Sequence, residues 1–118
     1  MNLNVRDAGE VAVLDLVGKL TRGDGDGLLR STVDSLLAGG RGKILVNLDK
    51  VPYMDSAGIG ELLASHQRAA ATGGIVKLLN PLKRVYDVLQ LVKLDSIFEI
   101  FADEAAALAS FAAGRPLS

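Results

Sequence analysis

Apolar and polar residues follow two alternating patterns along the chain, and each change of pattern marks a predicted element. Short, nearly continuous apolar segments indicate strands, and the first two of them are joined at Ala8-Gly9. The segment 11–17 is almost entirely apolar, as expected of a strand that is covered on both faces. Strands are predicted at residues 3–5, 11–17, 43–48, 75–79 and 97–101.

Between these segments, apolar residues recur at the spacing of one helix face. Asp24 or Asp26 is a candidate N-cap of the first helix, and Gly39-Gly40 is its candidate end. The third helix follows Asn80-Pro81 and is expected to turn Leu82 inward. Helices are predicted at residues 28–37, 59–70, 82–92 and 103–113. The apolar face of the second comprises Ile59, Leu62, Leu63, His66, Ala69 and Ala70.

This order of elements, a β-hairpin followed by alternating helices and strands, predicts an α/β fold. We expect a mostly parallel sheet of four to five strands with an antiparallel N-terminal edge, covered by about four helices. Neither an internal repeat nor a long linker interrupts the pattern. Residues 1–118 are therefore expected to form a single domain, and 118 residues are enough for one core.

The composition excludes several classes of function. The chain has no cysteine, which removes disulfide scaffolds and thiolate metal sites, and its single histidine leaves little for metal binding or acid–base chemistry. The net charge is −1 without a basic run, so no nucleic-acid partner is expected. No apolar stretch approaches membrane-spanning length, and the first residues do not resemble a signal peptide. A cytoplasmic protein without a membrane partner is predicted.

The segment YMDSAGIGELL, residues 53–63, stands out from this regular pattern. Gly58 and Gly60 fall in the first turns of a helix, where each glycine costs roughly 1 kcal/mol relative to alanine. Capping of the helix by a short oxygen side chain accounts for Asp55 or Ser56, but not for both. The small residues Ala57, Gly58 and Gly60 would also let another surface approach the serine. Capping and a functional serine both remain open from this segment alone.

Catalytic and ligand-binding interpretations of the segment fail on spacing. A nucleophile elbow needs glycine two residues before the serine, where this chain has Met54. His66 lies ten residues along the same helix, roughly 15 Å away, and cannot act as a base for Ser56. The segment Gly58-Ile59-Gly60 lacks the remaining residues of a phosphate-binding loop, and the GDGDG stretch at 23–27 lacks the ligands of a calcium loop. Neither an enzyme activity nor a cofactor or metal site is predicted.

Phosphorylation suits a hydroxyl at an exposed helix start. A phosphate there carries about −1.5 to −2 charges and faces the positive end of the helix dipole, so the fold tolerates it. A partner docked on the same surface would instead meet a bulky dianion. Ser56 is therefore a candidate switch that acts on binding.

These residues carry a resemblance to a known family. The segment LVNLDKVPYMDSAGIGELL resembles the signature of STAS domains, and in particular of bacterial anti-sigma factor antagonists. Downstream, GGIVKLLNPLKRVYDVLQLVKLDSIFEIF resembles the family's later elements in order and spacing, and Gly18-Lys19-Leu20 resembles its G-x-L. Two positions depart from the family pattern, since Thr21 and Asn47 stand where acidic residues are common. The resemblance implies the STAS fold over nearly the whole chain.

The resemblance further implies a partner switch. The unmodified protein would bind an anti-sigma factor that is a serine-protein kinase of the histidine-kinase-like ATPase fold, and so free a sigma factor. That kinase would phosphorylate Ser56, and a phosphoserine phosphatase would reset the switch. Asp55 would orient the helix start and contribute to docking. The implied partner surface comprises Lys19, Thr21, Asp55, Ser56, Ala57, Gly58 and Gly60, with the GDGDG loop beside it.

Two further functions stay open. The chain could be a scaffold subunit of a stress-sensing assembly, in which it contacts other STAS chains. It could also be a STAS component of a lipid or anion transport system, in which Ser56 is only a helix cap. A simple antagonist is expected to be a monomer or a weak homodimer, which separates it from the scaffold.

Overall fold

The computed structural model describes residues 1–23, 25 and 27–113. The chain begins with the hairpin of β1 (Asn2–Ala8) and β2 (Val11–Val17), which turns at Gly9 with a φ of 63°. The remaining elements are α1 (Leu28–Ala38), β3 (Lys43–Lys50), α2 (Ser56–Ala71), β4 (Ile75–Leu79), α3 (Lys83–Leu91), the short 3₁₀-helix η1 (Leu94–Ser96), β5 (Ile100–Phe101) and α4 (Glu104–Ala113).

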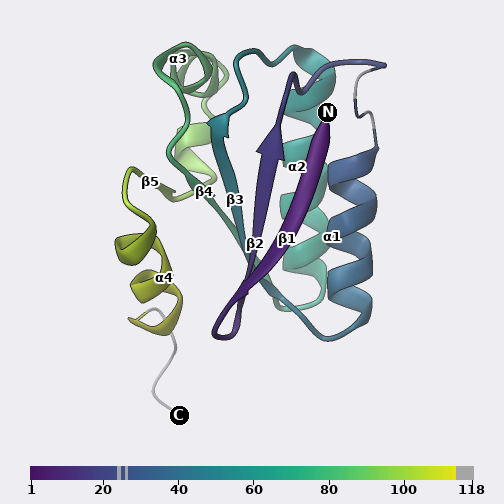
Figure 1. Cartoon of the computed structure of the whole chain (residues 1–118), viewed down its shortest axis with the longest axis vertical. Helices are drawn as coiled ribbons and strands as arrows, with labels where there is room; N and C mark the ends of the chain where they lie inside the picture. Colours follow the sequence, from purple (N-terminus) through teal and green to yellow (C-terminus); the bar gives the residue numbers. More distant parts are fainter. Residues whose placement is uncertain (24, 26, 114–118) are drawn as a thin grey trace.

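The five strands form one sheet in the order β1-β2-β3-β4-β5 (Figure 1). β1 pairs with β2 in antiparallel fashion, and every other pair is parallel. The structure therefore confirms the predicted fold class: a mostly parallel sheet with an antiparallel N-terminal edge and four α-helices in the described residues. None of the helices within this described part combines the length and apolar character that a membrane crossing needs.

Helices cover the two faces of the sheet unequally (Figure 1). On one face, Leu14 and Val46 of the sheet pack with Leu29 of α1, Leu62 of α2 and Val85 of α3 in the larger apolar cluster. On the other face a smaller cluster joins β2, β3 and β4 to α4; its buried members are Val11, Val13, Leu45, Leu79, Ala107 and Phe111. α4 is thus the only helix of the described residues on its side of the sheet.

Local geometry corrects parts of the predicted pattern. The last strand was expected at 97–101 but spans only Ile100–Phe101, because the backbone amides of Ile97 and Phe98 donate locally to the carbonyl of Leu94. Ile97 is consequently 43% exposed. Leu82 does not turn inward either, because it precedes the first helical residue of α3 in an extended conformation.

The ends and faces of two helices also differ in detail from the prediction. α1 ends at Gly39 as predicted, and its N-cap is Gly27, which supplies no side-chain oxygen. The candidate caps Asp24 and Asp26 lie outside the described residues. In α2, Ala70 is exposed while Glu61 and Ser65 are buried, so the inward face is rotated relative to the predicted one. The polar residues were overlooked because only apolar positions were counted.

Candidate functional site

The aspartate and the serine at the start of α2 have separate structural places. Asp55 is the N-cap: its Oδ1 accepts hydrogen bonds from the backbone amides of Ala57 (2.9 Å) and Gly58 (3.2 Å). Ser56 is the first helical residue and is exposed. Its hydroxyl has no hydrogen-bond partner among the described residues. Capping therefore explains Asp55 alone, and the Ser56 hydroxyl is not needed for it.

The carboxylate of Asp55 also ties a second loop to the helix start. Its Oδ2 accepts the backbone N–H of Arg22 at 3.2 Å. Partial removal from water raises the pKa of Asp55, but the backbone N–H donors of Arg22, Gly58 and Ala57 together hold it below its ordinary value. The N-cap is thus a carboxylate at neutral pH, and its negative charge is stabilised by the positive end of the helix dipole.

The two loops that carry the predicted site residues run side by side. The Leu20 amide donates to the Tyr53 carbonyl at 3.0 Å, and Leu20 forms a parallel bridge with Met54. The flanking residues Lys19, exposed, and Thr21, half-buried, therefore lie next to the α2 start. The structure brings these two segments together. The acidic residues of the GDGDG loop lie outside the described residues.

Gly58 and Gly60 have different surroundings, so the absence of a side chain has a different consequence at each position. Gly58 is buried, and a Cβ added there would lie 2.1 Å from the Leu20 carbonyl oxygen and 2.7 Å from Met54 Cγ. The prediction that Gly58 makes room for a partner is corrected: the close approach is to the chain's own loop. Gly60 is exposed and has no atom within 4 Å of an added Cβ, so its outward surface is open.

Sequence reasoning missed Glu61, the buried acidic residue of this region. Its side chain is 6% exposed; Oε1 accepts the backbone N–H of Arg30 at 3.3 Å, and Oε2 lies 3.7 Å from Arg30 Nε. Arg30 is the third residue of α1, so Glu61 satisfies an amide at the start of a helix that has no side-chain cap. An acid between Gly60 and Leu62 on the inward face is the signal that could have identified it.

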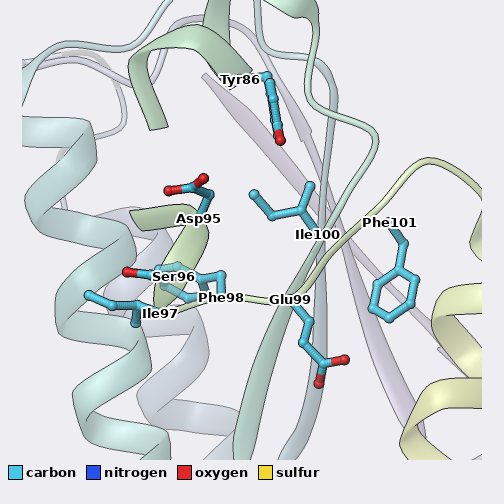
Figure 2. A pocket seen from close by; sticks show the side chains of 8 residues that line it. All are labelled: Tyr86, Asp95, Ser96, Ile97, Phe98, Glu99, Ile100 and Phe101. Carbon is cyan, nitrogen blue, oxygen red and sulfur yellow. The ribbon is translucent and has the colours of Figure 1, made fainter. Parts of the chain in front are cut away.

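Features elsewhere on the chain do not add chemistry to this site. The His66 ring packs edge-on against Phe98, with centroids 5.3 Å apart, and so has the packing role expected of it. A cavity of about 410 Å³ lies between α3 and β5 (Figure 2). Its titratable residues are Tyr86, Asp95 and Glu99, and Glu99 points away from Tyr86. The described residues contain no cluster of side chains suited to a metal ion.

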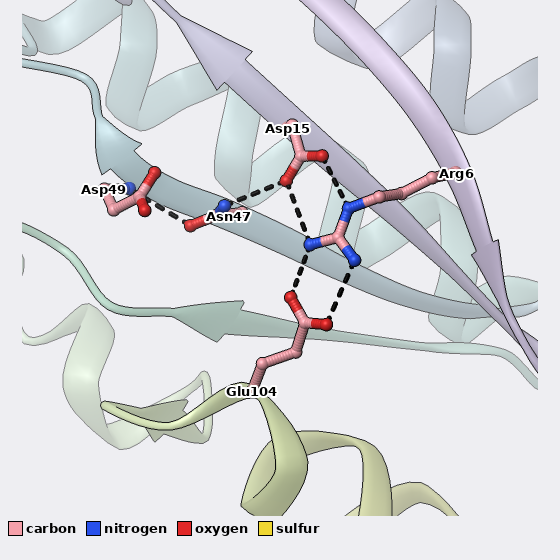
Figure 3. A network of polar contacts seen from close by, with 5 residues as sticks. All are labelled: Arg6, Asp15, Asn47, Asp49 and Glu104. Carbon is pink, nitrogen blue, oxygen red and sulfur yellow. Dashed lines mark hydrogen bonds and ion pairs between the residues drawn. The ribbon is translucent and has the colours of Figure 1, made fainter.

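A polar network on the face of the sheet that α4 covers explains the asparagine in β3 (Figure 3). Arg6 Nε lies 2.6 Å from Asp15 Oδ2, and the Arg6 guanidinium also binds Glu104 at the start of α4. Asn47 Nδ2 donates to Asp15 Oδ1 at 2.8 Å. A carboxylate at position 47 could not donate this hydrogen bond and would repel Asp15. Asn47 thus has a structural role within this network.

Comparisons with known proteins place the fold in a wider context. The family model of the STAS domain matches residues 2–107. A relative from Thermotoga neapolitana, a TM1081 homologue named for a role as an anti-sigma factor antagonist, is 34% identical over 68 residues. That match covers 58% of this chain and 60% of the relative, so the chain spans less than two thirds of the curated relative's length in this match.

Solved structures agree over most of the chain. The crystal structure of TM1081 from Thermotoga maritima, likewise described as an anti-sigma factor antagonist, superposes with a TM-score of 0.85 at 24% identity and covers 92% of each chain. The Bacillus protein SpoIIAA in its phosphorylated form gives a TM-score of 0.73 at 24% identity, over 93% of this chain and 99% of that one. Identities at this level show a shared fold.

Proposed function

Since the chain belongs to the STAS domain family, we propose that it is an anti-sigma factor antagonist, which binds an anti-sigma factor and so frees a sigma factor. The names of the relatives support this general role. An antagonist acts by binding rather than by catalysis, and this chain is accordingly a regulator and not an enzyme.

In the proposed switch, Ser56 is the phosphoacceptor. The partner is a serine-protein kinase of the histidine-kinase-like ATPase fold, and a phosphoserine phosphatase restores the binding form. One observation at the helix start carries the proposal. Asp55 caps α2, which leaves the Ser56 hydroxyl exposed and without a hydrogen-bond partner in the described residues. A kinase can therefore use the hydroxyl without breaking a contact of the fold.

Electrostatics explain how a phosphate would release the partner. The dianion on Ser56 would face the positive end of α2, which offsets part of its charge. It would also adjoin the ionised Asp55, whose pKa is already low. The chain tolerates this charge because the site is open to water, whereas a docked partner would have to desolvate it. Lys19, Thr21 and Gly60, which border the same site, are the proposed neighbouring contacts.

The proposal is tested by intact-mass and peptide mass spectrometry after incubation with ATP and a serine-protein kinase of the histidine-kinase-like ATPase fold. We expect one phosphate, mapped to Ser56. Ser56→Ala should fold, bind the kinase and resist release, while Ser56→Asp should bind poorly, although one carboxylate imitates a dianion only in part. Ser96→Ala, which alters an exposed serine of η1, is the matched control and should behave as the unmodified chain.

Two outcomes would contradict the switch. One is an active kinase and a folded chain without phosphate, which would favour a scaffold or a transport component in which Ser56 only begins a helix. The other is Ser56→Asp binding the kinase as tightly as the unmodified chain, which would remove the electrostatic basis of release.

A further inference from the structure

An arginine lies beside the serine at the start of α2. Leu20 forms a parallel bridge with Met54. Two positions further along these two segments are Arg22 and Ser56, so the register of the bridge brings them side by side. A hydrogen bond fixes this placement, because the backbone N–H of Arg22 donates to Asp55 Oδ2 at 3.2 Å. Arg22 is exposed and therefore adjoins the serine on the same surface.

The Arg22 guanidinium has no hydrogen-bond or ion-pair partner in the part of the chain that the structure describes. The neighbouring carboxylate of Asp55 meets Arg22 only through the backbone. Its Oδ1 accepts the amides of Ala57 and Gly58, and its Oδ2 accepts the amide of Arg22. The loop is thus held to the helix start by the main chain, while the five N–H donors of the guanidinium remain available for an anion.

We infer that Arg22 is an intramolecular clamp for the phosphate on Ser56. The inference rests on the proposed function, in which Ser56 is the phosphoacceptor, and it adds what the chain itself does with the modified serine. A guanidinium matches a phosphate in geometry, since two parallel N–H groups can bond two phosphate oxygens. Such charge-assisted hydrogen bonds order the segment that supplies the arginine. The clamp therefore fixes residues 19–23 against the start of α2 in the phosphorylated form alone.

The clamp also offsets a repulsion at the cap. The phosphate on Ser56 would adjoin the carboxylate of Asp55, and two neighbouring anions repel each other. A cation between them lowers the energy of both. Arg22 suits this place better than Lys19, the other exposed cation of the loop. By the register of the bridge, Lys19 lies beside Tyr53, three residues before the serine, and lysine offers a point charge without the paired donors of arginine.

The test uses the full chain with phosphoserine incorporated at position 56 during translation, so the measurement does not depend on a kinase. Phosphorus NMR follows the titration of the phosphate. We expect its second pKa to be lower with Arg22 present than in Arg22→Gln, because a neighbouring cation favours the dianion. Arg22→Lys keeps the charge without the paired donors and should give an intermediate pKa.

Arg68→Gln is the matched control for the change of charge. Arg68 lies twelve residues further along α2, roughly 18 Å from Ser56, and its ion pair with Asp34 is exposed. This substitution removes the same charge as Arg22→Gln and should leave the phosphate pKa unchanged.

Hydrogen exchange provides a second readout, which reports the ordering of the loop. The amides of Leu20 and Arg22 donate to Tyr53 and Asp55 and join the loop to the helix start. Their protection should rise about threefold on phosphorylation, the scale of an exposed ion pair, and this gain should disappear in Arg22→Gln. The substitution itself keeps the backbone N–H at position 22, so the bond to Asp55 stays in place before phosphorylation.

The outcomes separate the clamp from the function on which it rests. Equal phosphate pKa values in the unsubstituted chain and in Arg22→Gln would exclude the clamp and leave Ser56 as the proposed phosphoacceptor. A change of the pKa in Lys19→Gln but not in Arg22→Gln would assign the phosphate to Lys19 and also overturn the inference. A kinase that binds the chain without modifying Ser56 would overturn the proposed switch, and the clamp would lose its regulatory role whatever pKa the incorporated phosphoserine has.

Discussion

At the start of α2, a capping side chain and a modifiable hydroxyl are adjacent in sequence, and only the structure shows which does which. A serine at the N-cap would accept hydrogen bonds from the backbone amides with its side-chain oxygen, and phosphorylation would disturb the cap. Here Asp55 accepts the hydrogen bonds of the Ala57 and Gly58 amides, and Ser56 begins the helix with a hydroxyl that has no hydrogen-bond partner in the described part of the chain. Because the serine lies one position after the N-cap, it has no capping role and its side chain stays accessible.

Gly58 and Gly60 provide a residue-scale prediction, because the same substitution should have opposite effects. Gly58→Ala would place a Cβ 2.1 Å from the Leu20 carbonyl and should lower the free energy of unfolding by about 3 kcal/mol. Gly60→Ala meets no atom within 4 Å and should raise it by about 1 kcal/mol, as alanine favours the helix. Urea unfolding of the two variants measures both values, and equal effects would show that the contact with Leu20 does not limit position 58.

Among the helices, α1 depends on a neighbour for its start. Its N-cap is a glycine, and the carboxylate of Glu61 in α2 accepts the Arg30 amide in place of a local side chain. Glu61→Ala should lower the free energy of unfolding by about 2 kcal/mol, since it removes the charged acceptor of an amide at a helix start. Glu61→Gln keeps an acceptor oxygen and should lower the free energy of unfolding by less than half of that amount. Hydrogen exchange of residues 28–31 reports the effect, and unchanged exchange in the alanine variant would exclude Glu61 as the cap.

α4 is a second element held by side chains from the rest of the chain. Arg6 of β1 joins Asp15 to Glu104, and buried Lys77 donates to Ser110 at 2.9 Å and lies over the Phe111 ring. The hydrogen bond from Arg6 holds the pKa of Glu104 below its ordinary value against partial desolvation. For Asp15, desolvation raises the pKa, but Arg6 and Asn47 together lower it.

The direction of these pKa shifts determines how the stability of α4 depends on pH. Carboxyls with lowered folded pKa values stabilise the folded state fully above their ordinary pKa of about 4, and this contribution disappears as pH falls through the lower folded values. The protection of α4 amides, expressed relative to their intrinsic exchange rate at each pH, should therefore fall on acidification below about pH 4. Glu104→Gln should reduce this dependence, whereas Asp87→Asn, at an exposed ion pair of α3, should not. An α4 response that is the same in all three proteins would place the titrating group elsewhere.

Sequence patterns predicted these elements to different extents. Strands such as β2 and β4 were predicted with their observed limits because continuous apolar runs need burial on both faces. β5 was overestimated, since local hydrogen bonds to Leu94 compete with the sheet and leave no trace in an apolar pattern. Glu61 and Arg6 were not identified, because their partners, Arg30 and Glu104, are 31 and 98 residues away. Long-range polar pairs have no periodicity to detect.

On the scale of the whole molecule, the proposed switch occupies one end of the sheet and the two apolar clusters lie between the sheet and its helices. Ser56 is exposed and belongs to neither cluster. The Asp55 cap and the contact of Gly58 with Leu20 do not involve the serine hydroxyl. A phosphate there should therefore alter what the surface binds and leave the packing of the sheet as it was.

Hydrogen exchange with phosphoserine installed at position 56 tests this separation of surface from core without any need for the kinase. Protection should change only in the two adjoining loops, residues 19–23 and 53–60, and the free energy of unfolding should shift by less than about 1 kcal/mol, the scale of a charge at a helix end. The unmodified chain is the reference. If protection instead changed in β3 or α4, the phosphate would act by reshaping the fold, and partner release would need a conformational rather than an electrostatic explanation.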